Sequence, residues 1–154
     1  MADVSLGDRG ERRREAINLR FVDKLAEDVR EAARLAVEYT SKPYGELSDA
    51  ERYAVRYHII VVAEALTALL LHLARRGLGV RPETPLHALR ALRDAGLVRD
   101  DEYRDAVGII RLRNLLVHRY WAIDDKRIYD NVRGDFENLL KLVERLRAYA
   151  RGEV

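Results

Sequence analysis

Apolar residues recur at three- and four-residue steps along most of the chain, which is the spacing of one face of an α-helix. The pattern predicts helices over about residues 14–39, 48–76, 84–96 and 100–121, and a fifth helix from about residue 124 onward. The stripes of the first and fifth helices are Val22, Leu25, Val29, Ala33 and Ala36, and Ile128, Val132, Phe136, Leu139, Val143 and Leu146. No strand-like alternation of useful length appears.

Local signals mark several helix ends. Ser48 and Glu51 have the spacing of a capping box, which starts the second helix. Thr84 followed by Pro85 is a favourable N-cap and first-turn pair for the short third helix. The segment "RGLGVRP" ends the second helix with two glycines and a proline, and Gly96 ends the third.

These elements define an all-α protein with four long helices and one short helix. Because the connections are short, we expect an up-down antiparallel helical bundle. A chain of 154 residues fits one domain with one core. We expect that domain to span residues 14–150 and residues 1–13 to form a flexible basic tail.

The amino-acid composition limits the kinds of binding site that the chain can form. Charged residues make up 35% of the chain, but the net charge is only +2, so any nucleic-acid contact must be local. The absence of cysteine excludes disulfides and thiolate zinc sites. The four histidines lack metal-ligand spacing, so we expect no metal and no cofactor.

The most apolar segment covers residues 59–74 and contains Glu64 and His72. It is shorter than a membrane span usually is. The polar N-terminus has no apolar stretch of the kind found in a secretory signal. We therefore expect a buried helix in a soluble, cytoplasmic protein that makes no membrane contact.

The segment "RLRNLLVHRYWAID" carries Arg113, Asn114, His118 and Tyr120 within eight residues of a leucine-rich helix. On a helix that turns roughly 100° per residue, Arg113 and Tyr120 share one line, and Asn114 and His118 share the adjacent line. Arg113 and His118 diverge by roughly 140°. They converge only if the helix loosens at its end or if a second copy supplies the missing neighbour.

Structural readings of the same residues stay open. A histidine near a helix C-terminus can interact with the helix dipole, and Tyr120 can pack beside Trp121. Glu64 is better explained as a buried carboxylate paired with a neighbouring Arg or Tyr than as a catalytic group. The three other histidines are better explained as packing or surface residues. They are His58, His72 and His87.

The string "RNLLVHRY" has the pattern R-x4-H-x-Y, with Arg113, His118 and Tyr120 in the defining places. It resembles the motif of the HepT branch of the HEPN superfamily, which consists of small all-α proteins. The strings "ERYAVRYHIIVVAEAL", "LRALRDAGLV" and "AIDDKRIYDNV" resemble neighbouring parts of that family. The likeness covers about residues 16–148, and it implies a HEPN-like bundle.

The resemblance implies a metal-independent endoribonuclease that acts as the toxin of a toxin–antitoxin pair. An imidazole can accept and donate protons near neutral pH, and a guanidinium can stabilise the charge of a phosphorane. The implied roles are proton transfer for His118, phosphate binding for Arg113 and a supporting role for Asn114. Tyr120 would bind RNA or accept AMP groups from a nucleotidyltransferase antitoxin, which thereby neutralises the toxin.

Two other classes of function remain. Some related domains resemble non-catalytic nucleotide- or substrate-binding subunits of a nucleotidyltransferase complex, and a bare dimeric scaffold would leave the motif unexplained. The expected partners are a second copy of the chain, a cognate nucleotidyltransferase antitoxin and an RNA substrate. In the symmetric homodimer, the motif helix would lie near the two-fold axis, so that two Arg113 and two His118 side chains share one cleft.

Overall fold

The computed structural model describes residues 9–10, 14, 16–134 and 136–153, without the side chains of residues 133 and 134. The tail predicted over residues 1–13 lies outside this part of the chain, except for Arg9 and Gly10. Every regular element in the described part is helical, so the all-α fold is confirmed. The elements are α2 (Leu19–Tyr39), η1 (Tyr44–Glu46), α3 (Asp49–Arg76), α4 (Pro85–Asp94), α5 (Asp100–His118), η2 (Tyr120–Ala122), α6 (Asp125–Gly134) and α7 (Glu137–Ala150).

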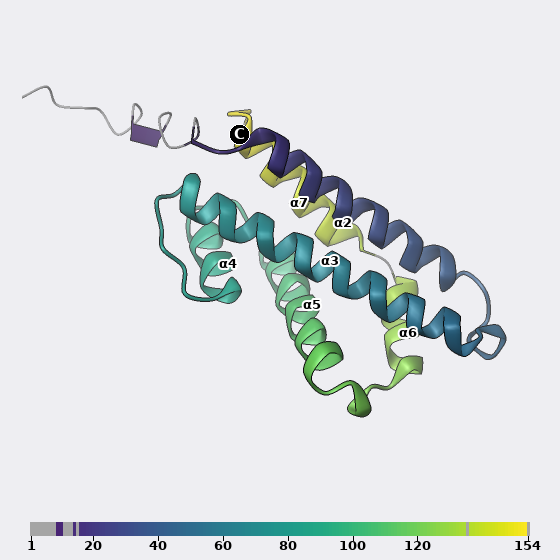
Figure 1. Ribbon diagram of the computed structural model, residues 1–154. Helices are drawn as coiled ribbons and strands as arrows, with labels where there is room; N and C mark the ends of the chain where they lie inside the picture. The colour runs from purple at the N-terminus through teal and green to yellow at the C-terminus, as the bar shows by residue number, and fades with distance from the viewer. Residues whose placement is uncertain (1–8, 11–13, 15, 135, 154) are drawn as a thin grey trace, which may run out of the picture.

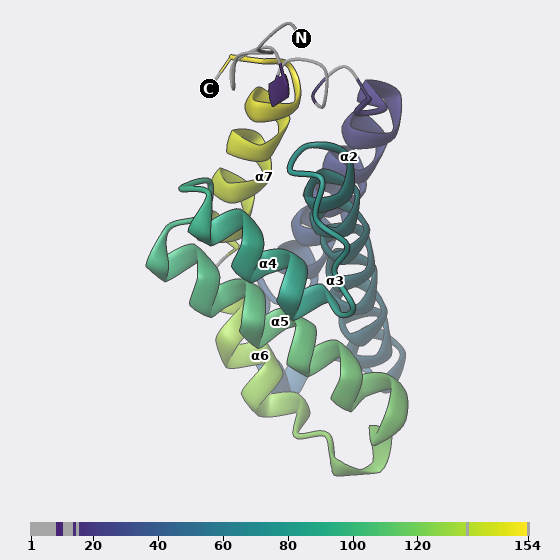
Figure 2. The same ribbon diagram turned by 90° about the vertical axis from the view of Figure 1, so that its left-hand side faces the viewer.

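The helices form a bundle around α3. Helices α2 and α3 form a long antiparallel pair, and α7 runs antiparallel along α2 (Figure 1). Helices α4 and α5 cover α3 on another side, as the turned view shows (Figure 2). The motif therefore lies at the end of α5 that is remote from the start of α2 and from the end of α7.

The core explains why α3 is so apolar. Its side chains Leu66, Leu69, Leu70 and Leu73 are fully buried, and α2, α4 and α5 pack against the helix. By length and composition alone, α3 is also the one described helix that could cross a membrane. The expectation that the apolar segment is too short for a span was therefore wrong, because a stretch of 18 residues in this helix is apolar enough. Its position in the bundle is nevertheless that of the predicted core helix.

The predicted caps are confirmed. The Ser48 hydroxyl accepts from the Glu51 N–H at 3.1 Å, and Glu51 accepts from the Ser48 N–H at the same distance. Thr84 accepts from the His87 N–H at 3.1 Å. Gly96 follows α4 with φ +81°, a left-handed conformation that favours glycine.

Three predicted boundaries were wrong. Helix α2 begins at Leu19 instead of about residue 14, because the Asn18 side chain caps it by accepting from the Phe21 N–H. The predicted fifth helix is divided into α6 and α7 next to Gly134, and glycine is a weak helix former. Helix α5 ends at His118 instead of near Trp121. The predicted apolar stripe after residue 124 is still buried on both parts of the divided helix.

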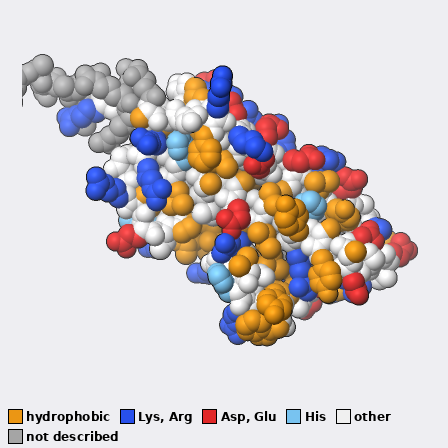
Figure 3. Space-filling view, viewed as in Figure 1, with side chains coloured by type: hydrophobic (Ala, Val, Ile, Leu, Met, Phe, Trp, Pro, Cys, Tyr) orange, Lys and Arg blue, Asp and Glu red, His pale blue; other side chains and the backbone are white. Residues whose placement is uncertain are grey.

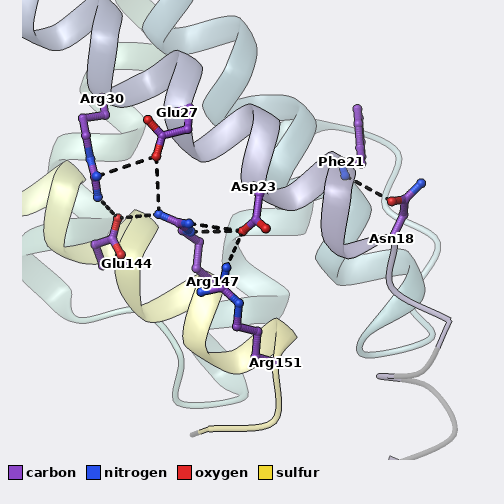
Figure 4. Close-up of polar contacts among 8 residues, drawn as sticks. All are labelled: Asn18, Phe21, Asp23, Glu27, Arg30, Glu144, Arg147 and Arg151. Carbon is purple, nitrogen blue, oxygen red and sulfur yellow. Dashed lines mark hydrogen bonds and ion pairs between the residues drawn. The ribbon is translucent and has the colours of Figure 1, made fainter.

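Ion pairs join α2 to α7. Arg147 lies between Asp23, Glu27 and Glu144, and Arg30 and Arg151 extend the network at its two ends (Figure 4). Burial disfavours the charge of Arg147, but the carboxylates raise its pKa above the usual value. These side chains are mostly half-exposed, so the network orients the two helices more than it stabilises the fold.

Helix α5 is tied to α7 by a buried charge. The Glu102 side chain is almost fully buried, and it accepts from the Arg145 guanidinium and from the Arg99 N–H. An unpaired carboxylate at this depth would cost several kcal/mol. The pair therefore fixes how the motif helix sits against α7.

His72 links the start of α2 to α3. Its Nε2 accepts from the Asn18 N–H at 3.0 Å, and its ring meets Phe21 edge-on. Only an imidazole without a proton on Nε2 can accept this bond. Burial, followed by the nearby charge of Arg76, lowers the pKa of His72 below its ordinary value.

We expect the melting temperature of the protein to fall as the pH drops from 7.5 to 5.5. A histidine whose pKa is lowered on folding binds its proton more readily in the unfolded chain, so stability is full above pH 6.5 and is lost below it. His58, whose pKa burial also lowers, adds to the effect. Calorimetry at both pH values measures this change in melting temperature.

A His72→Gln variant keeps an acceptor for the Asn18 N–H but has no imidazole that titrates, so its melting temperature should depend less on pH. An equal dependence would exclude the role of His72.

Candidate functional site

The four motif residues lie on two different elements. Arg113 and Asn114 lie in the last part of α5, and His118 is its final residue. Tyr120 lies outside the helix, in the 3-10 turn Tyr120–Ala122. The prediction that Tyr120 continues the line of Arg113 on one helix was therefore wrong.

Tertiary contacts explain why α5 ends early. The Arg119 N–H still bonds to the Leu115 carbonyl at 2.8 Å, but the backbone then turns. Six residues later, Asp125 accepts two hydrogen bonds from Arg56 of α3, at 2.7 and 2.8 Å. This pair, which raises the pKa of Arg56, holds the start of α6 against α3. The chain must leave the axis of α5 to reach that position.

Arg113 is held by two neighbours. Its Nε donates to the Glu64 carboxylate of α3, and its Nη1 donates to Asn114 Oδ1 at 3.2 Å. These bonds engage two of the five N–H donors of a guanidinium. The side chain is 30% exposed, so its remaining donors can meet a ligand from solvent.

Glu64 was predicted to be a buried carboxylate paired with a neighbouring Arg or Tyr. The pairing is confirmed, because Glu64 binds Arg113. The burial was wrong, since the side chain is 51% exposed. Glu64 thus faces the same solvent region as the motif arginine, and it restricts the guanidinium to one orientation.

Asn114 contributes its amide to the same cluster. Its Oδ1 accepts from Arg113, which leaves the Nδ2 group as a donor for an anion. An exposed donor beside a partly exposed guanidinium is a suitable arrangement for a phosphate oxygen.

His118 is exposed at the end of α5. Within the described part of the chain it forms no hydrogen bond or ion pair with Arg113. Hydrogen bonds therefore join Arg113 to Asn114 and Glu64, whereas none joins His118 to this cluster in the described part of the chain.

Tyr120 and Trp121 contact each other edge to face, with ring centroids 5.4 Å apart. The contact does not bury either ring, because their exposed fractions are 64% and 69%. The packing interpretation of Tyr120 is thus confirmed as a contact, but the phenol remains open to solvent.

Two exposed tyrosines near this cluster were not predicted from the sequence. Tyr53 and Tyr57 of α3 are 60% and 62% exposed, and with Glu64 they share one face of the helix. Their spacing of four residues places both rings on one face of a helix, and this was the feature of the sequence from which they could have been predicted. Val117 at the end of α5, and Tyr120 and Trp121 in the turn that follows, are exposed as well. Figure 3 shows hydrophobic side chains in several groups on this face, with charged and other side chains between them.

The geometry can be compared with known proteins. A family model described as "Ribonuclease HepT-like" matches residues 25–146, which include every motif residue. This chain belongs to the HepT-like ribonuclease family. No curated protein sequence matches it significantly.

Two solved structures resemble this HepT-like chain. One is YutE of Bacillus subtilis, a cytosolic protein of unknown function, with a TM-score of 0.69 and 18% identity over 86% of this chain and 92% of that one. The other is a protein of Thermus thermophilus, with a TM-score of 0.58 and 24% identity over 80% of this chain and 98% of that one. At these identities, the two structures support the fold alone.

Proposed function

We propose that this protein is a metal-independent endoribonuclease and the toxin of a toxin–antitoxin pair. Membership of the HepT-like ribonuclease family supports ribonuclease chemistry. The observation that carries the proposal is the oriented guanidinium of Arg113, which Glu64 holds with donors left for a phosphate.

The proposed reaction uses the 2′-hydroxyl of the RNA as the nucleophile. The 2′-oxygen attacks the adjacent phosphorus and loses its proton, and the bond from phosphorus to the 5′-oxygen breaks. The leaving oxygen takes a proton, so the products are a 2′,3′-cyclic phosphate and a 5′-hydroxyl. His118 transfers protons, and Arg113 and Asn114 bind the phosphorane oxygens.

The complete site requires two protomers. Arg113 and His118 diverge on α5, so a second copy across a two-fold axis is the source of the missing neighbour. The exposed aromatic side chains of Tyr53, Tyr57, Tyr120 and Trp121 support this arrangement. Aromatic side chains such as these are enriched at interfaces between proteins.

RNA cleavage by the purified protein in excess EDTA tests the proposal. We expect the products to end in a 2′,3′-cyclic phosphate, which mass spectrometry identifies. The matched control is the same oligoribonucleotide with 2′-deoxyribose at the cleaved position, and it should stay intact there. Cleavage of that control, or reversible inhibition by EDTA, would contradict the mechanism.

We further propose that the partner is a nucleotidyltransferase antitoxin that transfers AMP to Tyr120. The phenol is 64% exposed at the motif end of α5, so an enzyme can reach it. An AMP group at this position would place a phosphodiester and an adenosine beside the proposed cleft.

A further inference from the structure

A groove of about 710 Å³ runs between α5 and α6, two helices seen on the same face in Figure 2. Arg104, Gly108, Arg111 and Leu115 line it from one side of α5. Arg111 and Arg113 diverge by about 160° around the helix axis. The groove therefore lies on the opposite side of α5 from the contact with Glu64, and the proposed reaction makes no use of it.

The floor of the groove is aliphatic. It contains half-buried Leu112, Leu115 and Ile123, together with buried Ile128, Val132 and Leu139. Phe136 is the one aromatic side chain among the lining residues. Bases of single-stranded nucleic acids bind chiefly by stacking on aromatic rings. An aliphatic floor is instead suited to the side chains of another helix.

The rim of the groove is cationic. Arg104, Arg111 and Arg127 are exposed, and none forms an ion pair with a carboxylate in the described part of the chain. Two carboxylates also line the groove, and each accepts one hydrogen bond from a neutral donor and keeps its charge, so the lining carries three cationic and two anionic side chains. Asp105 accepts from Asn138 Nδ2 at 2.9 Å, and Asp124 accepts from the Arg127 N–H at 3.2 Å.

Gly108 lies in the middle of α5, where glycine costs about 1 kcal/mol relative to alanine. A Cβ atom added there would meet nothing within 4 Å among the described atoms, so packing within the chain does not require glycine. The missing side chain leaves the helix backbone exposed along the groove. A second backbone can approach closely at such a position.

We propose that this groove binds an amphipathic α-helix of a partner protein. Aliphatic side chains spaced i, i+4 and i+7 fill the floor, and the partner helix lies along α5 with its backbone closest at Gly108. Arg104 and Arg111 are seven residues apart, which is about 10.5 Å along the axis. Carboxylates two turns apart on the partner helix have the same spacing and pair with both guanidinium groups. This proposal does not depend on the ribonuclease activity.

A fluorescent label in the groove tests the proposal. The chain has no cysteine, so Asn131→Cys, on the lining, accepts a single environment-sensitive fluorophore. The probe is a synthetic helical peptide with Leu at i, i+4 and i+7 and Glu residues two turns apart. We expect saturable binding to the labelled protein and no response from a label at Ala50→Cys, an exposed position on α3.

Charge and shape are tested separately. A peptide with Gln in place of Glu should bind to the wild-type protein about tenfold more weakly than the Glu peptide does. The Glu peptide should likewise bind about tenfold more weakly to the Arg104→Ala/Arg111→Ala variant than to the wild type. Gly108→Ala should raise the melting temperature, because alanine favours a helix. Gly108→Leu should keep the fold and weaken binding at least about tenfold by filling the groove.

Three results would overturn the proposal. The Glu peptide gives no saturable response, the Gln peptide binds as tightly as the Glu peptide, or a single-stranded oligoribonucleotide displaces the label where the peptide does not. The last result would assign the groove to RNA. Loss of ribonuclease activity in any assay leaves these outcomes unchanged, because the readout is binding alone.

Discussion

Replacement of His118 or Arg113 by alanine is expected to lower the rate of RNA cleavage by about a hundredfold to ten-thousandfold. Positioned proton transfer contributes roughly this much to catalysis, and a fixed charge at the reacting phosphate contributes a similar factor. The melting temperature should change little, because His118 is exposed. Glu64 loses its partner in the Arg113→Ala variant, but its carboxylate is half-exposed and can be hydrated instead. Initial rates on a defined oligoribonucleotide, together with calorimetry, measure both quantities.

Matched controls exist in the same chain. Arg111→Ala removes an exposed arginine from the other side of α5, and His87→Ala removes an exposed histidine from α4. Both variants should keep at least half of the cleavage rate. If either control lost activity as the motif variants do, the site assignment to Arg113 and His118 would fail.

Mixing the two inactive variants tests the proposed dimer. When protomers of Arg113→Ala and His118→Ala are unfolded together and refolded, about half of the dimers combine one of each. Such a dimer retains one Arg113 and one His118 on opposite protomers, so about a quarter of the wild-type activity should return. No recovery, although light scattering shows dimers, would place the whole site within one protomer.

AMP transfer to Tyr120 is expected to abolish RNA cleavage without unfolding the bundle. In this step the phenol oxygen attacks the α-phosphorus of ATP, pyrophosphate leaves and the phenol proton is lost. The new phosphodiester carries a negative charge to the motif end of α5, where Arg113 has donors left for a phosphate. The adenosine fills space that the RNA requires.

The experiment combines the protein with a nucleotidyltransferase partner, ATP and magnesium, and follows intact mass and cleavage rate. AMP-sized additions should accumulate as activity is lost. Tyr120→Phe should keep the fold and resist both changes, and Tyr57→Phe, another exposed tyrosine, should behave as the wild type. Equal modification and inhibition of the Tyr120→Phe variant would show that another residue is the acceptor.

Local interactions made much of the fold predictable. The cap formed by Ser48 and Glu51 and the apolar stripe of α2 involve residues within a few positions of one another, so the sequence alone indicates them. The motif was also readable from its spacing, because Arg113, His118 and Tyr120 lie within eight residues. For the same reason, the sequence indicated that Arg113 and His118 point apart on one helix.

Contacts between distant residues decided the rest. The end of α5 depends on the pair between Arg56 and Asp125, which are 69 positions apart, and no local signal marks it. The orientation of Arg113 depends on Glu64 from another helix, 49 positions away. Spacing along the chain reports which side chains share a helix face, but packing decides which helix that face meets. By itself, the sequence determined the helices and the chemical groups of the motif, whereas the tertiary structure decided how those groups are held and which of them remain exposed.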